Sequence, residues 1–279
     1  MSLIDLLRAA VDWAAEGDHV GINLSGGLDS STVAALAGPL PTFTGWYNLP
    51  GFDERRYSRL VGTGHHHEIE ITPDDFVEHF DAMRAHIRPP VMGMGTFGQF
   101  MVARHASQYV DTVLSGEGSD ELFGGYARQM LVAGLPLPEG YDGYELPEGY
   151  PTDLAAALAY DYARLPELLA VDEAMCRAFS LTALAPFTDR RVVDYALALP
   201  VSERVGKRHL RAAVRGIVPD AIIDRRDKMG FPSPLVAWAQ TDPVRTFVLE
   251  RIGYLPDPAR PWDRAWWYDL IDRKEARAA

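Results

Sequence analysis

The sequence contains a single cysteine, Cys176, among 279 residues. One cysteine cannot form a disulfide within the chain, which fits a protein of the reducing cytosol, so we expect a cytoplasmic location. No apolar run reaches the roughly 18 to 20 residues needed to cross a bilayer. The first residues, MSLIDLLRAAVDWAAEGD, carry acids and no small-residue cleavage site, so they do not resemble a signal peptide.

Positive charge is also scarce, because 27 lysines and arginines face 39 acids and leave a net charge of -12. This balance argues against a general nucleic-acid binder or a membrane-surface protein. The bases are nevertheless unevenly spread, and eight of them fall in one short segment: Arg204, Lys207, Arg208, Arg211, Arg215, Arg225, Arg226 and Lys228. Two interpretations stay open for this segment, a solvated helix face or a local cradle for a polyphosphate.

Two familiar ligand-binding patterns are absent or misplaced. The string G-x-x-x-x-G-K-[ST] of the Walker loop does not occur. Gly93–Gly98 formally satisfies G-x-G-x-x-G, but it follows Pro89-Pro90 and not a strand, so we interpret it as a flexible loop that caps a helix beside the pocket. The consecutive histidines His65–His67 would alternate faces of a strand, and we predict no metal site there.

The residues that are present predict an α/β protein with a doubly wound parallel sheet. Apolar spacing indicates a helix from Leu3 to Ala14, and strands are expected over 19–24, 42–47, 67–71 and 110–114, with helices over 76–86 and 97–107 between them. Further helices are expected over 154–162, 171–179, 191–199, 207–215 and 244–252. We therefore predict an α/β lobe over residues 1–135, a linker or mobile loop over 136–149, and a C-terminal helical lobe over 150–279.

The segment Ser25-Gly-Gly-Leu-Asp-Ser30 carries the clearest chemical signal. It follows a predicted strand and precedes a predicted helix. Adjacent glycines let backbone N–H groups close around an anion, and the helix N-terminus adds partial positive charge. Asp29 would repel a bare phosphate, so we expect it to hold a Mg²⁺ ion that the phosphate also ligates.

A second acidic turn, Ser115-Gly-Glu-Gly-Ser-Asp-Glu121, follows the strand predicted over 110–114. Loops at the carboxyl ends of neighbouring parallel strands share one crevice. Asp120 is therefore expected to face Asp29 across a bound Mg-pyrophosphate. Glu117 lies between two glycines, which leaves it room to approach a substrate.

Together these motifs resemble the synthetase domain of glutamine-dependent asparagine synthetase and its relative β-lactam synthetase. The first loop matches the S-G-G-x-D-S loop of ATP pyrophosphatases. Three later segments resemble, in order, the R-x-P-F-L-D, G-K-x-x-L-R and R-x-x-K-x-G-F patterns of the family: Ala185–Asp189, Gly206–Arg211 and Arg225–Pro234. All five matches follow the family's order over roughly residues 20 to 240.

The resemblance implies an ATP- and Mg²⁺-dependent ligase that adenylates a carboxylate, releases pyrophosphate and forms an amide. It implies that Asp29 and Asp120 ligate Mg²⁺, that Lys228 stabilises charge during both half-reactions, and that Glu117, supported by Asp161, assists deprotonation of the amine. The ATP-binding residues implied are Leu24, Ser25, Gly26, Gly27, Asp29, Ser30, Gly116, Lys207 and Lys228.

Two departures from the family pattern bear on the substrates. No cysteine precedes Cys176, so we expect no glutaminase activity in this chain and leave three nitrogen sources open: free ammonia, a substrate amine, or a separate glutaminase or carrier chain. Thr182 and Leu184 replace the family's acid and base before the Pro-Phe pair, so aspartate cannot be assumed as the small-molecule carboxylate. The alternatives are an ATP pyrophosphatase that modifies a tRNA base and a non-catalytic nucleotide-binding module.

Overall fold

The computed structural model describes residues 1–62, 65–87, 93–139, 141, 143–227, 233–260 and 264–272. Its centre is a five-stranded sheet in the order β3-β2-β1-β4-β5, in which every neighbouring pair is parallel. The strands are β1 (Val20–Asn23), β2 (Thr42–Trp46), β3 (His66–Glu70), β4 (Thr112–Leu114) and β5 (Thr182–Leu184). The predicted doubly wound parallel sheet is confirmed.

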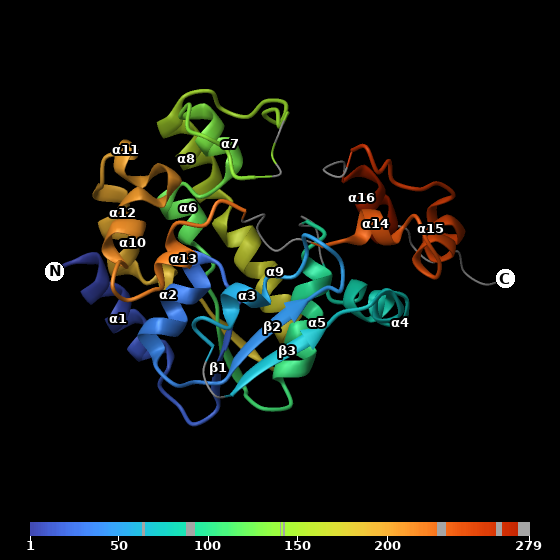
Figure 1. Cartoon of the computed structure of the whole chain (residues 1–279), viewed down its shortest axis with the longest axis horizontal. Helices are drawn as coiled ribbons and strands as arrows, with labels where there is room; N and C mark the ends of the chain where they lie inside the picture. The colour runs from blue at the N-terminus through green and yellow to red at the C-terminus, as the bar shows by residue number, and fades with distance from the viewer. Residues whose placement is uncertain are drawn as a thin grey trace.

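Helices cover both faces of the sheet because successive strand residues point to opposite sides. Ile22 and Leu114 join one buried cluster with α1 (Leu3–Ala14), α2 (Leu28–Ala37) and α10 (Arg190–Ala198). Phe43 and Val113 face the other way and pack with α5 (Thr96–Ala106) and α9 (Leu165–Arg177). Cys176 is buried on that side as a free thiol. Figure 1 shows the two helical layers on either side of the strands.

The C-terminal helices form a third cluster beside α4 (Pro73–Arg84). Here α14 (Leu235–Trp238), α15 (Val244–Ile252) and α16 (Ala265–Asp272) gather at one side of the molecule (Figure 1). Trp266 and Trp267 of α16 are almost fully buried against Phe80 and its neighbours, so they belong to the core. Trp262 lies outside the described residues.

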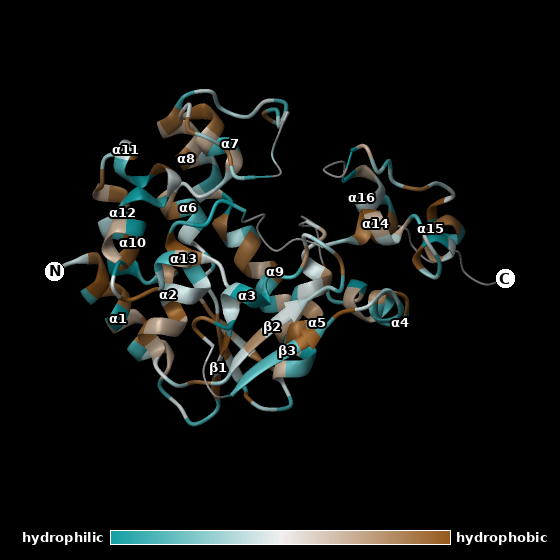
Figure 2. Cartoon of the chain, in the orientation of Figure 1, coloured by the Kyte–Doolittle hydropathy of each residue, from teal (hydrophilic) through white to brown (hydrophobic). Residues whose placement is uncertain are grey.

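Short helices surround the carboxyl edge of the sheet. They are α3 (Arg55–Ser58), α6 (Ser119–Phe123), α7 (Ala127–Val132), α8 (Leu154–Ala163), α11 (Val201–Arg204), α12 (Arg208–Ala213) and α13 (Asp220–Ile223), with 3₁₀ turns at Pro186–Thr188 and Val205–Lys207. The edge strand β3 is hydrophilic, as Figure 2 shows, with two histidines and two glutamates among five residues. Charged and polar side chains on an edge strand disfavour pairing with another chain.

Two features differ from the sequence-based expectation. β5 lies inside the segment predicted to be helical, and it pairs with β4 at the end of the sheet. Three residues are too few to show a strand period, so local pattern could not reveal it. The helix expected over 207–215 begins at Arg208, because Lys207 adopts a left-handed φ of 58°. Among the described helices, none combines the length and the apolar character needed to span a bilayer.

Candidate active site

The two predicted loops meet at the point where the strand order reverses. β1 leads outward to β2 and β3, whereas β4 leads to β5 on the other side. In such sheets ligands bind in the crevice at the carboxyl ends of the two central strands. The approach is close at Gly116, where an added Cβ would lie 2.7 Å from the Cβ of Asp29. A glycine is therefore required for the loops to lie together.

The loop after β1 is held by its own hydroxyl groups. The backbone N–H of Ser25 donates to Ser30 Oγ at 3.2 Å, and the two serine hydroxyls lie 3.0 Å apart. Gly26 has a φ of 71°, and a Cβ there would lie 2.7 Å from the backbone nitrogen of Ser58. Gly27 begins α2 without a side-chain cap. The uncapped N-terminus of α2 can therefore bind an anion.

Lys207 links the two acids predicted to bind metal. Its Nζ lies 2.6 Å from Asp29 Oδ2 and 2.5 Å from Asp120 Oδ1, and Ser119 Oγ donates to Asp29 Oδ1 at 2.7 Å. Burial alone would lower the pKa of Lys207, but Asp120 and Asp29 outweigh that effect and hold the pKa above its usual range. Gly125 makes room for this ion pair, because its added Cβ would lie 1.8 Å from Asp120 Oδ1.

This arrangement fits a Mg²⁺ ion together with phosphates. Two carboxylate oxygens from different loops contact one nitrogen atom, so they are close enough to share a cation. Mg²⁺ is commonly held by one or two carboxylates and completes its shell with water and substrate phosphates. No group of three or more His, Cys, Asp and Glu side chains suited to a metal occurs in the described ranges.

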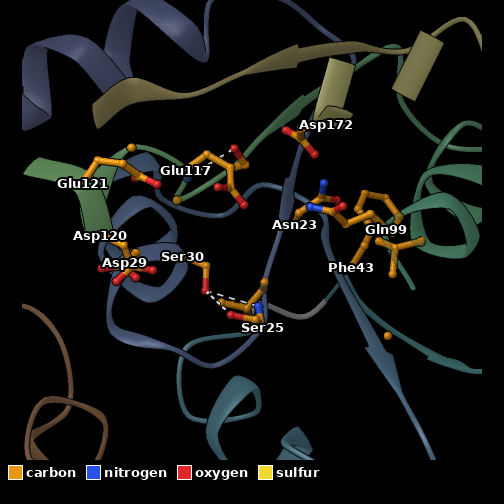
Figure 3. A pocket seen from close by; sticks show the side chains of 16 residues that line it. Asn23, Ser25, Asp29, Ser30, Phe43, Gln99, Glu117, Asp120, Glu121 and Asp172 are labelled. Atoms are coloured by element: carbon orange, nitrogen blue, oxygen red, sulfur yellow. Dashed lines mark hydrogen bonds between the residues drawn. The ribbon is translucent and has the colours of Figure 1, made fainter. Parts of the chain in front are cut away.

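The central cavity has a volume of about 160 Å³ and lies between the two loops. Figure 3 shows Asp29 and Asp120 close together on one side of it, and Ser25 beside Ser30 near its middle. Its other polar side chains include Asn23, Gln99, Glu117, Glu121 and Asp172. Leu24 and Gly116 also line the cavity, so most of the predicted nucleotide-binding residues share one space.

A second space, which we call the tyrosine cavity, has a volume of about 400 Å³ and shares Gln99, Glu117 and Glu121 with the central cavity. Tyr126, Tyr150 and Tyr160 line it, together with Asp161 and the arginines Arg128, Arg164 and Arg264. Glu117 therefore borders both spaces.

Asp161 lies in the tyrosine cavity with Glu117, but its hydrogen bonds go to other residues. Tyr150 Oη donates to Asp161 Oδ2 at 2.5 Å, and Arg128 Nε donates to Oδ1 at 2.9 Å. The Arg128 guanidinium also stacks on Tyr126, 3.9 Å from the ring centre. Asp161 thus orders the wall of the cavity through Arg128 and Tyr150, and its support of Glu117 stays a prediction.

Sequence reasoning assigned no role to two buried acids, Glu121 and Asp172. Glu121 accepts a hydrogen bond from the Tyr126 hydroxyl at Oε1, while its Oε2 is buried without a partner in the described part of the chain. Burial, and secondly Asp120, raise the pKa of Glu121 to about 7. Burial raises the pKa of Asp172 to about 6, although a hydrogen bond from Ser115 acts in the opposite direction and lowers it. The sequence did contain a signal for Asp172, because this acid falls on the apolar face of the helix predicted over 171–179, where a buried charge points to a function.

The site residues predicted from the sequence lie around these two cavities and the Lys207 ion pair, with one exception. Lys228 lies outside the described residues, so its predicted role stays a prediction. Within the basic segment, Arg204 donates to the backbone carbonyl of Leu122 at 2.7 Å and supports α6. Arg215 pairs with Asp220 and Asp224 at the surface.

Comparison with known proteins decides the family. A family model described as asparagine synthase matches residues 2–138 and 151–278. The chain belongs to the asparagine synthase family. The resemblance inferred from the five motifs is thereby confirmed.

Individual relatives agree with this assignment. A putative glutamine-hydrolysing asparagine synthetase of Mycobacterium bovis is 28% identical and covers 84% of this chain. Asparagine synthetase 1 of Bacillus subtilis is 26% identical over 80% of it, and asparagine synthetase B of Escherichia coli is 26% identical over 79%. The matched regions make up 48%, 48% and 42% of these relatives, so the chain spans about half the length of the asparagine synthetases it matches.

Proposed function

We propose that this member of the asparagine synthase family is an ATP-dependent amide ligase. It adenylates a carboxylate, releases pyrophosphate, and transfers the acyl group to ammonia or an amine. The observation that carries the proposal is the meeting of the Ser25–Ser30 loop with Asp120 across Lys207, directly beside a cavity bordered by Glu117. A phosphate site adjoining a carboxylate base is what the two half-reactions need.

In the first half-reaction, an oxygen of the substrate carboxylate attacks the α-phosphorus of ATP. The bond from that phosphorus to the bridging oxygen breaks, and pyrophosphate leaves with the electron pair. The N-terminus of α2 and the serine hydroxyls bind the phosphates, and Lys207 balances their charge. When bound at Asp29 and Asp120, Mg²⁺ supplies further positive charge to the phosphates.

In the second half-reaction, an amine nitrogen attacks the acyl carbon and AMP leaves with the electron pair of the carbon–oxygen bond. The nitrogen must lose a proton as it attacks, and a carboxylate positioned beside it can accept that proton. We assign this role to Glu117, and its position in the lining of both the central cavity and the tyrosine cavity supports the assignment. Asp161, Arg128 and Tyr150 hold the wall opposite the nucleotide.

We propose that the nitrogen arrives as ammonia or as a substrate amine, and that the acid differs from aspartate. A cavity of about 400 Å³ lined by three tyrosines supports an acid larger than aspartate. Arg264 lines the same cavity and makes no ion pair with any described residue. This arginine therefore supports a second acidic group on the substrate acid. A specialised amide ligase fits these features better than an asparagine-forming enzyme does.

The expected products test the first half-reaction. ATP labelled at the α-phosphate should give labelled AMP, with one pyrophosphate released for each amide formed, when candidate acids are supplied with ammonia or amines. Glutamine as the sole nitrogen donor should give no amide. ADP and orthophosphate as primary products would refute the proposal, and stoichiometric release of glutamate would refute the proposed nitrogen source.

Glu117→Gln should separate the two half-reactions. Amide formation should fall about 10²- to 10⁴-fold, the usual contribution of a positioned general base. ATP–pyrophosphate exchange, which reports adenylation alone, should change much less. Glu16→Gln is the matched control, since it makes the same change at an exposed position just after α1. Amide formation at the normal rate by Glu117→Gln would show that the base is another residue.

A further inference from the structure

A third space, which we call the arginine cavity, lies on the far side of the Lys207 ion pair. It has a volume of about 400 Å³ and shares Asp120 with the central cavity. Lys207 itself lines the arginine cavity, as does Leu28 at the start of α2. The bridge from Asp29 through Lys207 to Asp120 therefore separates the arginine cavity from the central cavity.

The lining of the arginine cavity is strongly cationic. Five bases and two acids contribute to it: Lys207, Arg208, Arg211, Arg225, Arg226, Asp120 and Asp224. Both acids are already engaged, Asp120 by Lys207 and Asp224 by the surface residue Arg215. In a chain of net charge -12, this concentration of positive charge attracts an anion.

Three arginines of the cavity, Arg208, Arg211 and Arg226, form no ion pair with a described acid, so their positive charge is available to a ligand. Arg225 is neutralised by Glu54 at 2.6 Å and Asp227 at 3.0 Å. By contrast, Arg208 and Arg211 donate, among the residues that the structure describes, only to the backbone carbonyls of Ser202 and Gly206.

Arg226 has no side-chain partner within the described ranges, and its backbone carbonyl accepts from the N–H of Glu139 at 2.8 Å. That bond ties the Leu135–Pro138 wall of the cavity to the arginine rim. Guanidinium groups are well suited to phosphate oxygens, and several around one space suit a multivalent anion.

We propose that the arginine cavity is a pyrophosphate site through which this product leaves. The proposal rests on the function proposed above, in which pyrophosphate is formed beside Asp29, Asp120 and Lys207. From there it passes the Lys207 bridge and meets the half-buried Arg211 and, at the surface, the exposed Arg208 and Arg226. Departure on this side leaves the acyl-adenylate in the central cavity, next to Glu117, while the amine enters from the tyrosine cavity.

The test is the double variant Arg208→Gln/Arg226→Gln, in which two exposed arginines lose their charge. We expect the Kd for pyrophosphate with Mg²⁺, measured by calorimetry without acid or amine, to rise about tenfold or more, because each lost charge-assisted hydrogen bond weakens binding. The Kd for ATP should change less than twofold. Arg245→Gln, an exposed arginine on α15, makes the same type of change away from the cavity and should leave both values unaltered.

Three outcomes would overturn the inference. An unchanged Kd for pyrophosphate would show that the arginines do not bind it. An equal loss of ATP affinity would place both arginines in the ATP site itself. Failure of the wild-type chain to bind pyrophosphate would also refute it. The proposed function is judged separately, by amide formation and ATP–pyrophosphate exchange, so its failure is distinguishable from each of these results.

Discussion

Asp29→Asn is expected to reduce ATP–pyrophosphate exchange by about 10³-fold, the scale on which loss of a preorganised electrostatic contact acts in an enzyme site. Both carboxylate oxygens of Asp29 are in use: Oδ1 accepts from Ser119 Oγ, and Oδ2 contacts Lys207 Nζ. Asparagine removes the negative charge and replaces one carboxylate oxygen with an NH₂ group, which cannot ligate Mg²⁺, so only an uncharged carbonyl oxygen is left to contact the ion. The same loss is expected for Asp120→Asn, the acid on the other side of Lys207.

The measurement is the exchange of labelled pyrophosphate into ATP over a range of Mg²⁺ concentrations. Asp194→Asn is a suitable control, because it makes the same change on an exposed position of α10. Near-normal exchange by either active-site variant at ordinary Mg²⁺ would contradict the assignment of that residue. A loss that high Mg²⁺ partly reverses would be the clearest support for a role in binding the metal.

Lys207→Met is expected to lower the free energy of unfolding by about 3–5 kcal/mol in the absence of divalent cations. The Lys207 side chain is 6% exposed and that of Asp29 is 8% exposed, so the variant would leave two negative groups close together with no cation between them. Adding Mg²⁺ should recover part of the loss, because the ion can take the place of the ammonium group between the carboxylates.

Urea unfolding with and without Mg²⁺ measures this effect. The double variant Asp29→Asn/Lys207→Met provides the control, since removing one of the two repelling charges should make it less destabilised than Lys207→Met alone. A Lys207→Met chain as stable as the wild type, or equally unstable with and without Mg²⁺, would contradict the argument. ATP–pyrophosphate exchange by Lys207→Met should also be severely reduced, because Lys207 balances phosphate charge in the proposed reaction.

The sequence by itself determined the sheet and the loops that carry the chemistry. Helix and strand periods are local properties of the chain, so α1, β1 and α15 could be expected close to their observed bounds. The rule that ligands bind at the carboxyl ends of parallel strands then predicts from the sequence that Asp29 and Asp120 lie close together. The family followed from the order of five short motifs, and it too required no tertiary information.

Only the tertiary structure decided which strands pair and which residues contact one another in the site. β5 is too short to show a period, and it becomes a strand because β4 offers it an unpaired edge. Asp161 accepts hydrogen bonds from Arg128 and Tyr150, which lie 33 and 11 residues away from it in the sequence. These two donors belong to segments with no common sequence pattern. Lys207 meets Asp29 across 178 residues, a contact that requires a left-handed backbone at Lys207 and the absence of a side chain at Gly125. Such contacts depend on how distant segments pack against each other, and local spacing carries no record of that packing.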